Sequence, residues 1–328
     1  MGSMNGKMMS ESASSIPKIS NSVLERIGNT SLLQLHNIVP KDHARILIKL
    51  ESENPTGSMK DRAALAMVES AERDGRLKSG GRVVEYTGGS TGVSLSLVCA
   101  VKGLALDIVT SDAFSIEKRS QMTALGASLT IIKSDSGGMD EALTRNMIEA
   151  AQNIQEEYDS FLTDQLKNQD QLSCYHDMGE EIWQQTGGKV DAFVHSVGTS
   201  ASLRGIAESL RKHNQDIDIV AVEPSESAVL SGEKSGSHKI EGIGAGFVVP
   251  LWDPEIVGEI ARVSTEESMA MARRLANEEA VFAGTSTGGN LIAALRKAKE
   301  LGPDSTVVTV MVDSGIKYLS TALYKDVK

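Results

Sequence analysis

Cysteine and long apolar runs are scarce in this sequence. Its 328 residues contain two cysteines, Cys99 and Cys174, which cannot by themselves form a disulfide framework or a multi-cysteine zinc site. No stretch approaches the roughly 18 uninterrupted apolar residues of a membrane-spanning helix. We therefore expect a cytoplasmic protein that has no membrane partner and no metal site.

Positive charge is also in deficit, with 33 Lys and Arg residues against 44 Asp and Glu residues and a net charge of −11. This balance gives no electrostatic footprint for nucleic acid or for an anionic membrane surface, although a local pocket for a small anion remains compatible with it. We expect no nucleic-acid partner.

Aromatic residues make up only 4% of the chain, whereas glycine occurs 30 times. Aliphatic strands joined by glycine-containing loops would produce this imbalance. From about Ser22 the pattern alternates strand and helix, which predicts an α/β protein with parallel sheets covered on both faces. The predicted strands are 44–50, 82–86, 105–110, 128–132, 192–197, 218–222 and 307–312, and the predicted helices are 61–74, 93–102, 116–125, 139–157, 203–214, 265–278 and 289–301.

The first fifteen residues are rich in serine and methionine and lack the apolar segment of a secretory signal. We expect a disordered tail over residues 1–21.

Loops that leave a strand and enter a helix are informative because open α/β sheets bind ligands at the carboxyl ends of their strands. The run Asn-Pro-Thr-Gly-Ser-Met-Lys-Asp-Arg at 54–62 places Lys60 at a helix N-terminus, where the helix dipole disfavours a cation. A lysine with a lowered pKa is suited to form a Schiff base. A surface lysine paired with an acid is the alternative.

Two further loops, Thr87 to Gly92 and Gly198 to Ser202, each follow a predicted strand and open a predicted helix. Backbone N–H groups at a helix N-terminus can bind a carboxylate or a phosphate, although the first loop could equally be a tight turn. A fourth loop, Asp313-Ser314-Gly315, follows the last predicted strand and alone is ordinary turn chemistry.

Serine hydrolysis is a competing interpretation. Residues 88–92 and 284–288 both match Gly-x-Ser-x-Gly, and Ser90 lies between a strand and a helix, as a nucleophile elbow requires. The histidines that follow Ser90 are His195, His213 and His238, and none follows Ser286. None of the three lies in a distinctive loop near the chain end, which disfavours a catalytic triad.

Taken in order, these loops, with Gly-Ile-Gly-Ala-Gly-Phe at 242–247 and Asp-Ser-Gly-Ile-Lys-Tyr-Leu-Ser-Thr at 313–321, resemble the cysteine synthase family. These fold type II pyridoxal-phosphate enzymes include O-acetylserine sulfhydrylase and the catalytic core of cystathionine β-synthase. The resemblance covers about residues 22–325. It implies two three-layer α/β domains with mostly parallel twisted sheets, a larger one formed by 22–53 and 167–328 and a smaller mobile one formed by 54–166.

The resemblance also implies a set of site residues. Lys60 would form the internal aldimine with pyridoxal 5′-phosphate and act as the catalytic base, and Ser314 would meet the pyridine nitrogen. The implied cofactor-binding residues are Lys60, Ser90, Gly198, Thr199, Ser200, Ala201, Ser202 and Ser314. The implied receptor for the substrate α-carboxylate consists of Thr87, Gly88, Gly89, Ser90, Thr91 and Gln165.

The implied reaction is β-replacement on a β-substituted alanine such as O-acetylserine, through an aminoacrylate. Sulfide or another small nucleophile would then give cysteine or a related amino acid. β-Elimination on serine or cysteine, and a catalytically silent cofactor- or partner-binding relative, are the alternatives. Family members are usually homodimers, so a homodimer is implied here.

The sequence departs from the family at both anion-binding loops. The family's substrate loop reads Thr-Ser-Gly-Asn-Thr-Gly, whereas this chain has Gly88 and Ser90 at the Ser and Asn positions. The family's phosphate loop reads Gly-Thr-Gly-Gly-Thr, and here Ser200 and Ala201 replace two glycines. Backbone donors survive the second change if neither position needs a positive φ.

Overall fold

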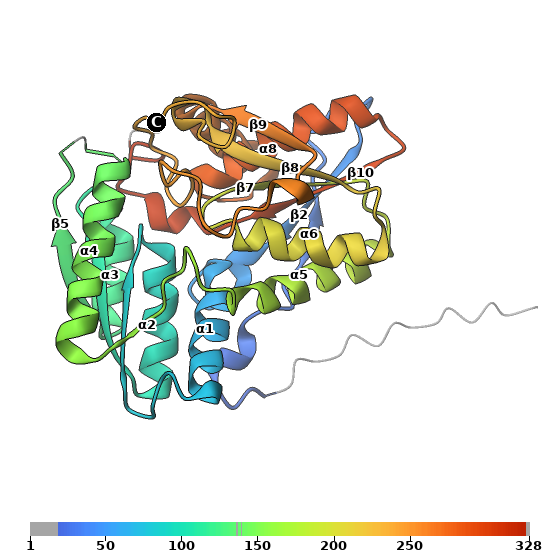
Figure 1. Cartoon of the computed structure of the whole chain (residues 1–328). Coiled ribbons are helices and arrows are strands. Elements are labelled where there is room, and N and C mark those ends of the chain that lie inside the picture. Colours follow the sequence, from blue (N-terminus) through green and yellow to red (C-terminus); the bar gives the residue numbers. More distant parts are fainter. Residues whose placement is uncertain (1–18, 136, 139, 326–328) are drawn as a thin grey trace, which may run out of the picture.

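The computed structural model describes residues 19–135, 137–138 and 140–325 (Figure 1). The tail predicted over residues 1–21 lies outside this part of the chain except for its last three residues. Two separate sheets organise the described residues, one of six strands and one of four. The structure is thus α/β, with mostly parallel sheets, as the sequence predicts.

The larger sheet has the strand order β1-β2-β10-β7-β8-β9. Only β1 runs antiparallel to its neighbour, and β10 pairs in parallel with both β2 and β7. All six residues of β10 are buried, which suits a central strand covered on both faces. The strands are β1 (Leu32–Gln34), β2 (Arg45–Leu50), β7 (Ala192–Ser196), β8 (Asp218–Pro224), β9 (Glu259–Val263) and β10 (Thr306–Met311).

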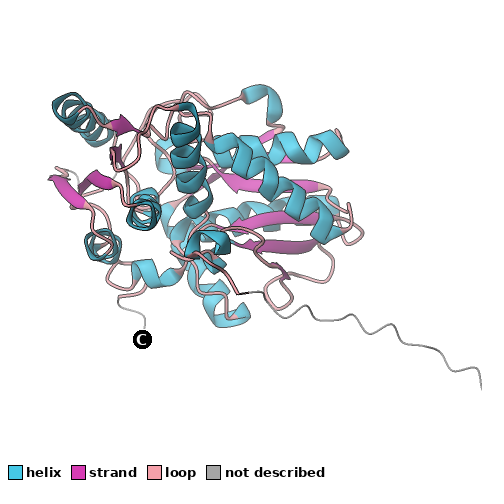
Figure 2. Ribbon diagram, turned by 90° about the horizontal axis from the view of Figure 1, so that it is seen from below, coloured by secondary structure: helices cyan, strands magenta, loops and turns pink. Residues whose placement is uncertain are grey.

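Alternating side chains of the larger sheet enter two different cores. Phe193 and Val308 pack with helices α5 (Gln171–Thr186) and α6 (Ala201–His213), whereas Val194 and Val307 pack with α7 (Thr265–Glu279) and α8 (Thr285–Leu301). Because the side-chain period of a strand is two, successive residues point to opposite faces. The sheet therefore forms the middle of three layers, with strands between helices in Figure 2.

The smaller sheet is entirely parallel, with the order β5-β4-β3-β6. Its strands are β3 (Arg82–Tyr86), β4 (Ala105–Ser111), β5 (Ser128–Ile132) and β6 (Phe161–Leu162). Val83 and Ile108 pack with α1 (Lys60–Asp74) and α2 (Ser90–Lys102), and Val84 on the opposite face shares a core with α4 (Glu141–Tyr158). Helix α3 (Ile116–Ala124) packs beside α2 (Figure 1). We call the part of the molecule built on this sheet the smaller lobe and the part built on the six-stranded sheet the larger lobe.

Every strand of the smaller sheet lies between residues 54 and 166, and every strand of the larger sheet lies outside this range. This distribution supports our proposal that residues 54–166 form a smaller domain and that residues 22–53 and 167–328 form a larger one.

Several elements differ from the sequence prediction. Helix α5 and the strands β1, β6 and β9 were not predicted. Helix α5 packs on α6 through glycines, since a Cβ on Gly179 would lie 2.6 Å from Cβ of Ser209. Leu172, Tyr175, Met178 and Ile182 nevertheless form a buried apolar face at helical spacing, so the sequence carried the signal for this helix and the prediction was wrong to omit it.

Three helices begin two or more residues earlier than predicted, namely α2 at Ser90, α6 at Ala201 and α8 at Thr285. Short polar residues obscure these starts in the sequence, and the shifts bring Ser90 and Ser286 into first helical turns. Within the part of the chain that the structure describes, no helix is both long enough and apolar enough to cross a membrane.

Candidate active site

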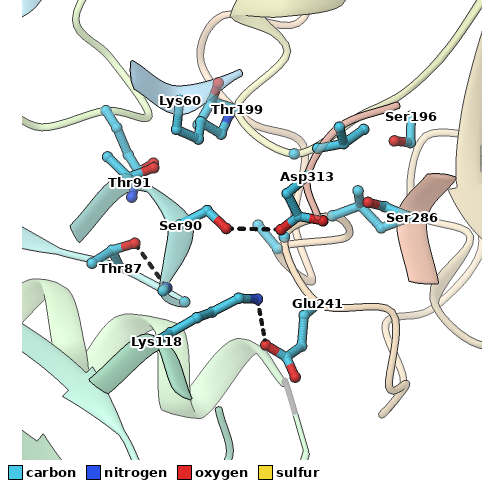
Figure 3. A pocket seen from close by; sticks show the side chains of 18 of the residues that line it. Lys60, Thr87, Ser90, Thr91, Lys118, Ser196, Thr199, Glu241, Ser286 and Asp313 are labelled. Atoms are coloured by element: carbon cyan, nitrogen blue, oxygen red, sulfur yellow. Dashed lines mark hydrogen bonds and ion pairs between the residues drawn. The ribbon is translucent and has the colours of Figure 1, made fainter. Parts of the chain in front are cut away.

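One cavity lies where the carboxyl ends of β3, β7 and β10 meet, with an empty volume of about 940 Å³ that includes its open mouth. Its lining combines apolar side chains with a few polar groups, as ligand-binding pockets do. Its walls come from the start of α1, the loops after β3, β7 and β10, the segment 241–245 and the start of α8 (Figure 3). Chain segments far apart in the sequence therefore share one site.

Lys60 lines this cavity as the first residue of α1, and only 9% of the residue is exposed. Burial lowers the pKa of its ammonium group to about 8. The adjacent Asp61 accepts hydrogen bonds from the Thr56 N–H (2.8 Å) and the Ser94 hydroxyl (2.6 Å), which hold the preceding loop against α2. The start of α1 is thus held in place, and the amine of Lys60 loses its proton around pH 8.

The loop after β3 brings Thr87, Gly88, Gly89, Ser90 and Thr91 to the cavity wall, together with Gln165. Thr91 Oγ1 donates to Gln165 Oε1 (2.7 Å), and Gln165 Nε2 donates to the Tyr86 carbonyl (2.8 Å). Both polar ends of Gln165 are therefore held. The N-terminus of α2 at Ser90 points its backbone donors at this wall, as a carboxylate receptor requires.

Beneath this loop, the fully buried Glu85 accepts hydrogen bonds from the backbone N–H of Gln165 (3.0 Å) and the hydroxyl of Thr163. Burial raises the pKa of this carboxyl group to about 8. Glu85 ties residues 163–165 to β3 and so fixes the position of Gln165.

Only Gly198 and Thr199 of the predicted phosphate loop line the cavity itself. A Cβ on Gly198 would lie 2.3 Å from the Gly242 carbonyl oxygen, so a side chain cannot fit there. Ala201 is the first residue of α6, and Ser202 hydrogen-bonds with its Oγ to Nε2 of His195 (2.9 Å).

The predicted phosphate loop has non-glycine residues at two positions where the family has glycine, and one of these positions adopts a positive φ. Ser200 has φ of +72°, the left-handed conformation that favours glycine, whereas Ala201 does not have a positive φ. The loop retains its shape despite the serine, at a cost in backbone strain.

Ser314, the residue predicted to meet the pyridine nitrogen, is not among the residues that line the cavity. Its hydroxyl accepts a hydrogen bond from the Ile316 N–H (3.3 Å) and caps η5 (Gly315–Tyr318). Ser286 and Asp313 line the cavity instead. The Gly-x-Ser-x-Gly pattern at 284–288 marked Ser286 in the sequence, but it was interpreted there only as a hydrolase elbow.

Asp313 is 2% exposed and its two carboxylate oxygens differ in their partners. Oδ2 accepts from the Ser90 hydroxyl (2.9 Å) and the Tyr318 hydroxyl (2.8 Å), whereas Oδ1 is buried without a hydrogen-bond partner among the described residues (Figure 3). A buried, unpaired acceptor on a cavity wall is costly unless a ligand supplies a donor.

Lys118 and Glu241 form an ion pair on the same wall (2.7 Å), and the ammonium group also donates to the Tyr318 hydroxyl (3.0 Å) (Figure 3). Their side chains are 2% and 13% exposed. Lys118 belongs to α3 and Glu241 to the segment after β8, so the pair joins the two lobes. The sequence did not identify Lys118 or Glu241 as site residues, because neither lies in one of the motifs and nothing in the sequence indicates that they are close together.

The histidines considered for a serine hydrolase all have other partners. His195 bonds to Ser202, His213 to Glu180 and His238 to the Gly244 carbonyl. Ser90 bonds to Asp313, so the arrangement expected of a catalytic triad is not formed by these residues.

Comparisons with known proteins agree with this geometry. The family model described as pyridoxal-phosphate dependent enzyme matches residues 23–313. A cysteine synthase of Staphylococcus aureus is 41% identical over 306 residues, which cover 93% of this chain and 97% of that protein.

Solved structures give the same result. The crystal structure of a cysteine synthase from Entamoeba histolytica matches with a TM-score of 0.88 and 35% identity, covering 100% of this chain and 95% of that one. An O-ureido-L-serine synthase matches with a TM-score of 0.86 and 33% identity, covering 95% and 97%. The chain belongs to the family of pyridoxal-phosphate dependent enzymes.

Proposed function

We propose that this protein catalyses pyridoxal-phosphate-dependent β-replacement on a β-substituted alanine such as O-acetylserine. Sulfide or another small nucleophile adds in the second half of the reaction and gives cysteine or a related amino acid. The observation that supports this most directly is Lys60, a buried amine with a pKa of about 8 on the wall of a cavity that also presents two helix N-termini. The similarity to cysteine synthases supports the choice of substrate class.

The residues present fit the cofactor. Lys60 is the amine for its aldehyde, and the first turn of α6 with Gly198 and Thr199 is the receptor for its phosphate. The cofactor, when bound, withdraws electrons from the substrate Cα and so makes loss of a β-substituent possible. Ser286 lines the cavity, and we propose that it meets the ring nitrogen in place of Ser314.

The remaining residues of the wall bind and orient the amino acid. Thr87 to Thr91 and Gln165 receive its carboxylate through backbone N–H groups and short polar side chains. The neutral amine of Lys60 takes the proton from the substrate Cα, because a group with a pKa near the working pH suits general-base catalysis.

We also propose a cytoplasmic homodimer. Both cysteines are free, which suits a reducing compartment. The exposed apolar residues Ile116, Ile316 and Leu319 lie on or beside α3 and η5, which contact each other. Such a patch suits an interface between two copies, and sedimentation velocity checks the oligomeric state.

The test uses borohydride reduction of the protein after incubation with pyridoxal phosphate, followed by peptide mapping. We expect an absorption band at about 410 nm before reduction and a covalent adduct on Lys60. Lys60→Ala should lose the band, the adduct and β-replacement. Lys317 is a matched control, because burial also lowers its pKa to about 8 but it does not line the cavity.

Two outcomes would overturn the proposal. One is an adduct on Lys317 in place of Lys60, and the other is full turnover by Lys60→Ala. A holoenzyme that releases ammonia and a keto acid from O-acetylserine, with no product from sulfide, would identify a β-elimination lyase instead.

A further inference from the structure

His195 is a fully buried imidazole on β7, directly beneath the N-terminal turn of α6. Burial and the nearby positive charge of Lys60 lower its pKa to about 3, so the ring is neutral at physiological pH. A neutral imidazole has one donor and one acceptor nitrogen, and its surroundings decide which is which.

The amide of Asn290 decides the tautomer. Its Oδ1 accepts the Ser196 backbone N–H (2.8 Å), and because a backbone N–H can only donate, the orientation of this amide is unambiguous. Its Nδ2 then donates to the Val310 carbonyl (3.0 Å) and faces Nδ1 of His195 at 3.4 Å. An NH₂ group cannot accept, so Nδ1 of His195 carries the lone pair.

The proton of His195 is consequently on Nε2, which lies 2.9 Å from Ser202 Oγ. The imidazole donates and the serine oxygen accepts. Ser202 is 3% exposed, and within the described residues its own O–H has no acceptor. A buried hydroxyl proton without an acceptor is therefore left in the first turn of α6, where backbone N–H groups favour an anion.

We propose that His195 is a positioning residue which, oriented by Asn290, makes Ser202 a dedicated hydrogen-bond donor to the phosphate group of the cofactor. This inference rests on the proposed function. A serine hydroxyl can normally rotate between donating and accepting roles, whereas the Nε2–H of His195 removes this freedom. Asn290 on α8 bonds to both β7 and β10, so three elements together hold the amide that orients His195.

The proposal predicts linked affinities. Ser202→Ala and His195→Phe, which keeps a ring of similar size, should each raise the dissociation constant of pyridoxal phosphate for the apoenzyme about tenfold. The double variant should lose no more affinity for pyridoxal phosphate than either single variant, because both changes remove the same hydrogen bond. The dissociation constant of pyridoxal, which has no phosphate, should change less than about twofold in all variants.

Ser209→Ala is the matched control. Ser209 is on the same helix, is 1% exposed and is likewise hydrogen-bonded to a side chain, here as a donor to Glu180, but it lies two turns from the phosphate end. It should leave both affinities unchanged. Equal losses for pyridoxal and pyridoxal phosphate in His195→Phe would show a merely structural role and overturn the proposal.

A second measurement does not depend on variants. Nitrogen-15 spectra of histidine-labelled wild-type holoenzyme should show His195 with its proton on Nε2, and a proton on Nδ1 would overturn the assignment. Failure of the wild-type protein to bind pyridoxal phosphate would instead contradict the proposed function, and the two failures are thus distinguishable.

Discussion

Ser200 adopts a backbone conformation that glycine adopts at lower cost. Ser200 has a φ of +72° and lies between β7 and Ala201, the first residue of α6. A left-handed conformation costs a residue with a Cβ about 1–2 kcal/mol. The strain lies within the proposed phosphate receptor, so a change at Ser200 tests its cost directly.

We expect Ser200→Gly to raise the free energy of unfolding by about 0.5–1 kcal/mol, because relief of the left-handed strain exceeds the added entropy of the unfolded chain. Urea denaturation of the two apoproteins checks this. The neighbouring Ala201→Gly is the control, and it should lower stability by a similar amount because Ala201 is helical. A destabilised Ser200→Gly would show that the serine makes a compensating contact.

The pKa of Lys60 predicts how cofactor capture depends on pH. Only the neutral amine reacts with an aldehyde, and its fraction falls about tenfold per pH unit below the pKa. The capture rate of pyridoxal phosphate by the apoprotein should therefore rise up to about pH 8 and then level off. Stopped-flow absorbance measures this, with free lysine as the control, and a rate that keeps rising to pH 10 would contradict the shift.

At the scale of elements, helix α1 is anchored by a buried network of charges. Arg62 pairs with Glu51 (2.8 Å) and with Glu181 on α5 (2.7 Å), and Lys49 on β2 also pairs with Glu181 (2.7 Å). The network fixes the helix whose first residue is Lys60, and so it sets the direction of the amine.

Arg62→Met should lower the free energy of unfolding by about 3–5 kcal/mol, because it leaves the buried carboxylate of Glu51 without its counter-charge. The control is Arg274→Met, which breaks an i,i+4 pair with Glu278 whose side chains are 51% and 35% exposed. That change should cost less than about 1 kcal/mol. Chemical denaturation measures both, and similar losses would contradict the importance of burial.

At the scale of the whole molecule, polar groups join the two lobes across the cavity, and one buried apolar core also spans both lobes, with Val84 of the smaller lobe and Phe193 of the larger lobe in the same cluster. Lys118 pairs with Glu241, and Ser90 pairs with Asp313, so each lobe contributes one partner to each interaction. The lobes are therefore held together both by these polar pairs and by shared apolar packing.

Lys118→Met should destabilise the protein by about 3 kcal/mol, since Glu241 is left with an unpaired charge in a buried position. Adding Glu241→Gln should restore part of this loss, with a coupling of about 1 kcal/mol or more. Urea denaturation gives the coupling, and hydrogen exchange over residues 238–246 tests whether the lobes separate. Strictly additive losses would show that the pair does not join them.

The strand and helix pattern, the glycine loops and the position of Lys60 could be predicted because each depends on local sequence. Amphipathic spacing marks α1, and a short polar loop after an aliphatic strand marks a ligand-binding edge. The partners of Ser90 and Lys118 could not be predicted. Asp313 and Glu241 lie 223 and 123 residues away in the chain, and only the packing of two sheets brings them together.

By itself, the sequence determined the α/β class and the two loops that end in helix N-termini, because these follow from periodicity and from the chemistry of short segments, whereas the role predicted for Lys60 came from the resemblance to a family. The tertiary structure decided which of Ser286 and Ser314 lines the cavity, which backbone is strained at Ser200, and which histidine bonds to Ser202. Those outcomes depend on side-chain direction and long-range packing. A strand that shifts by one residue reverses them, and local sequence does not specify that register across separate elements.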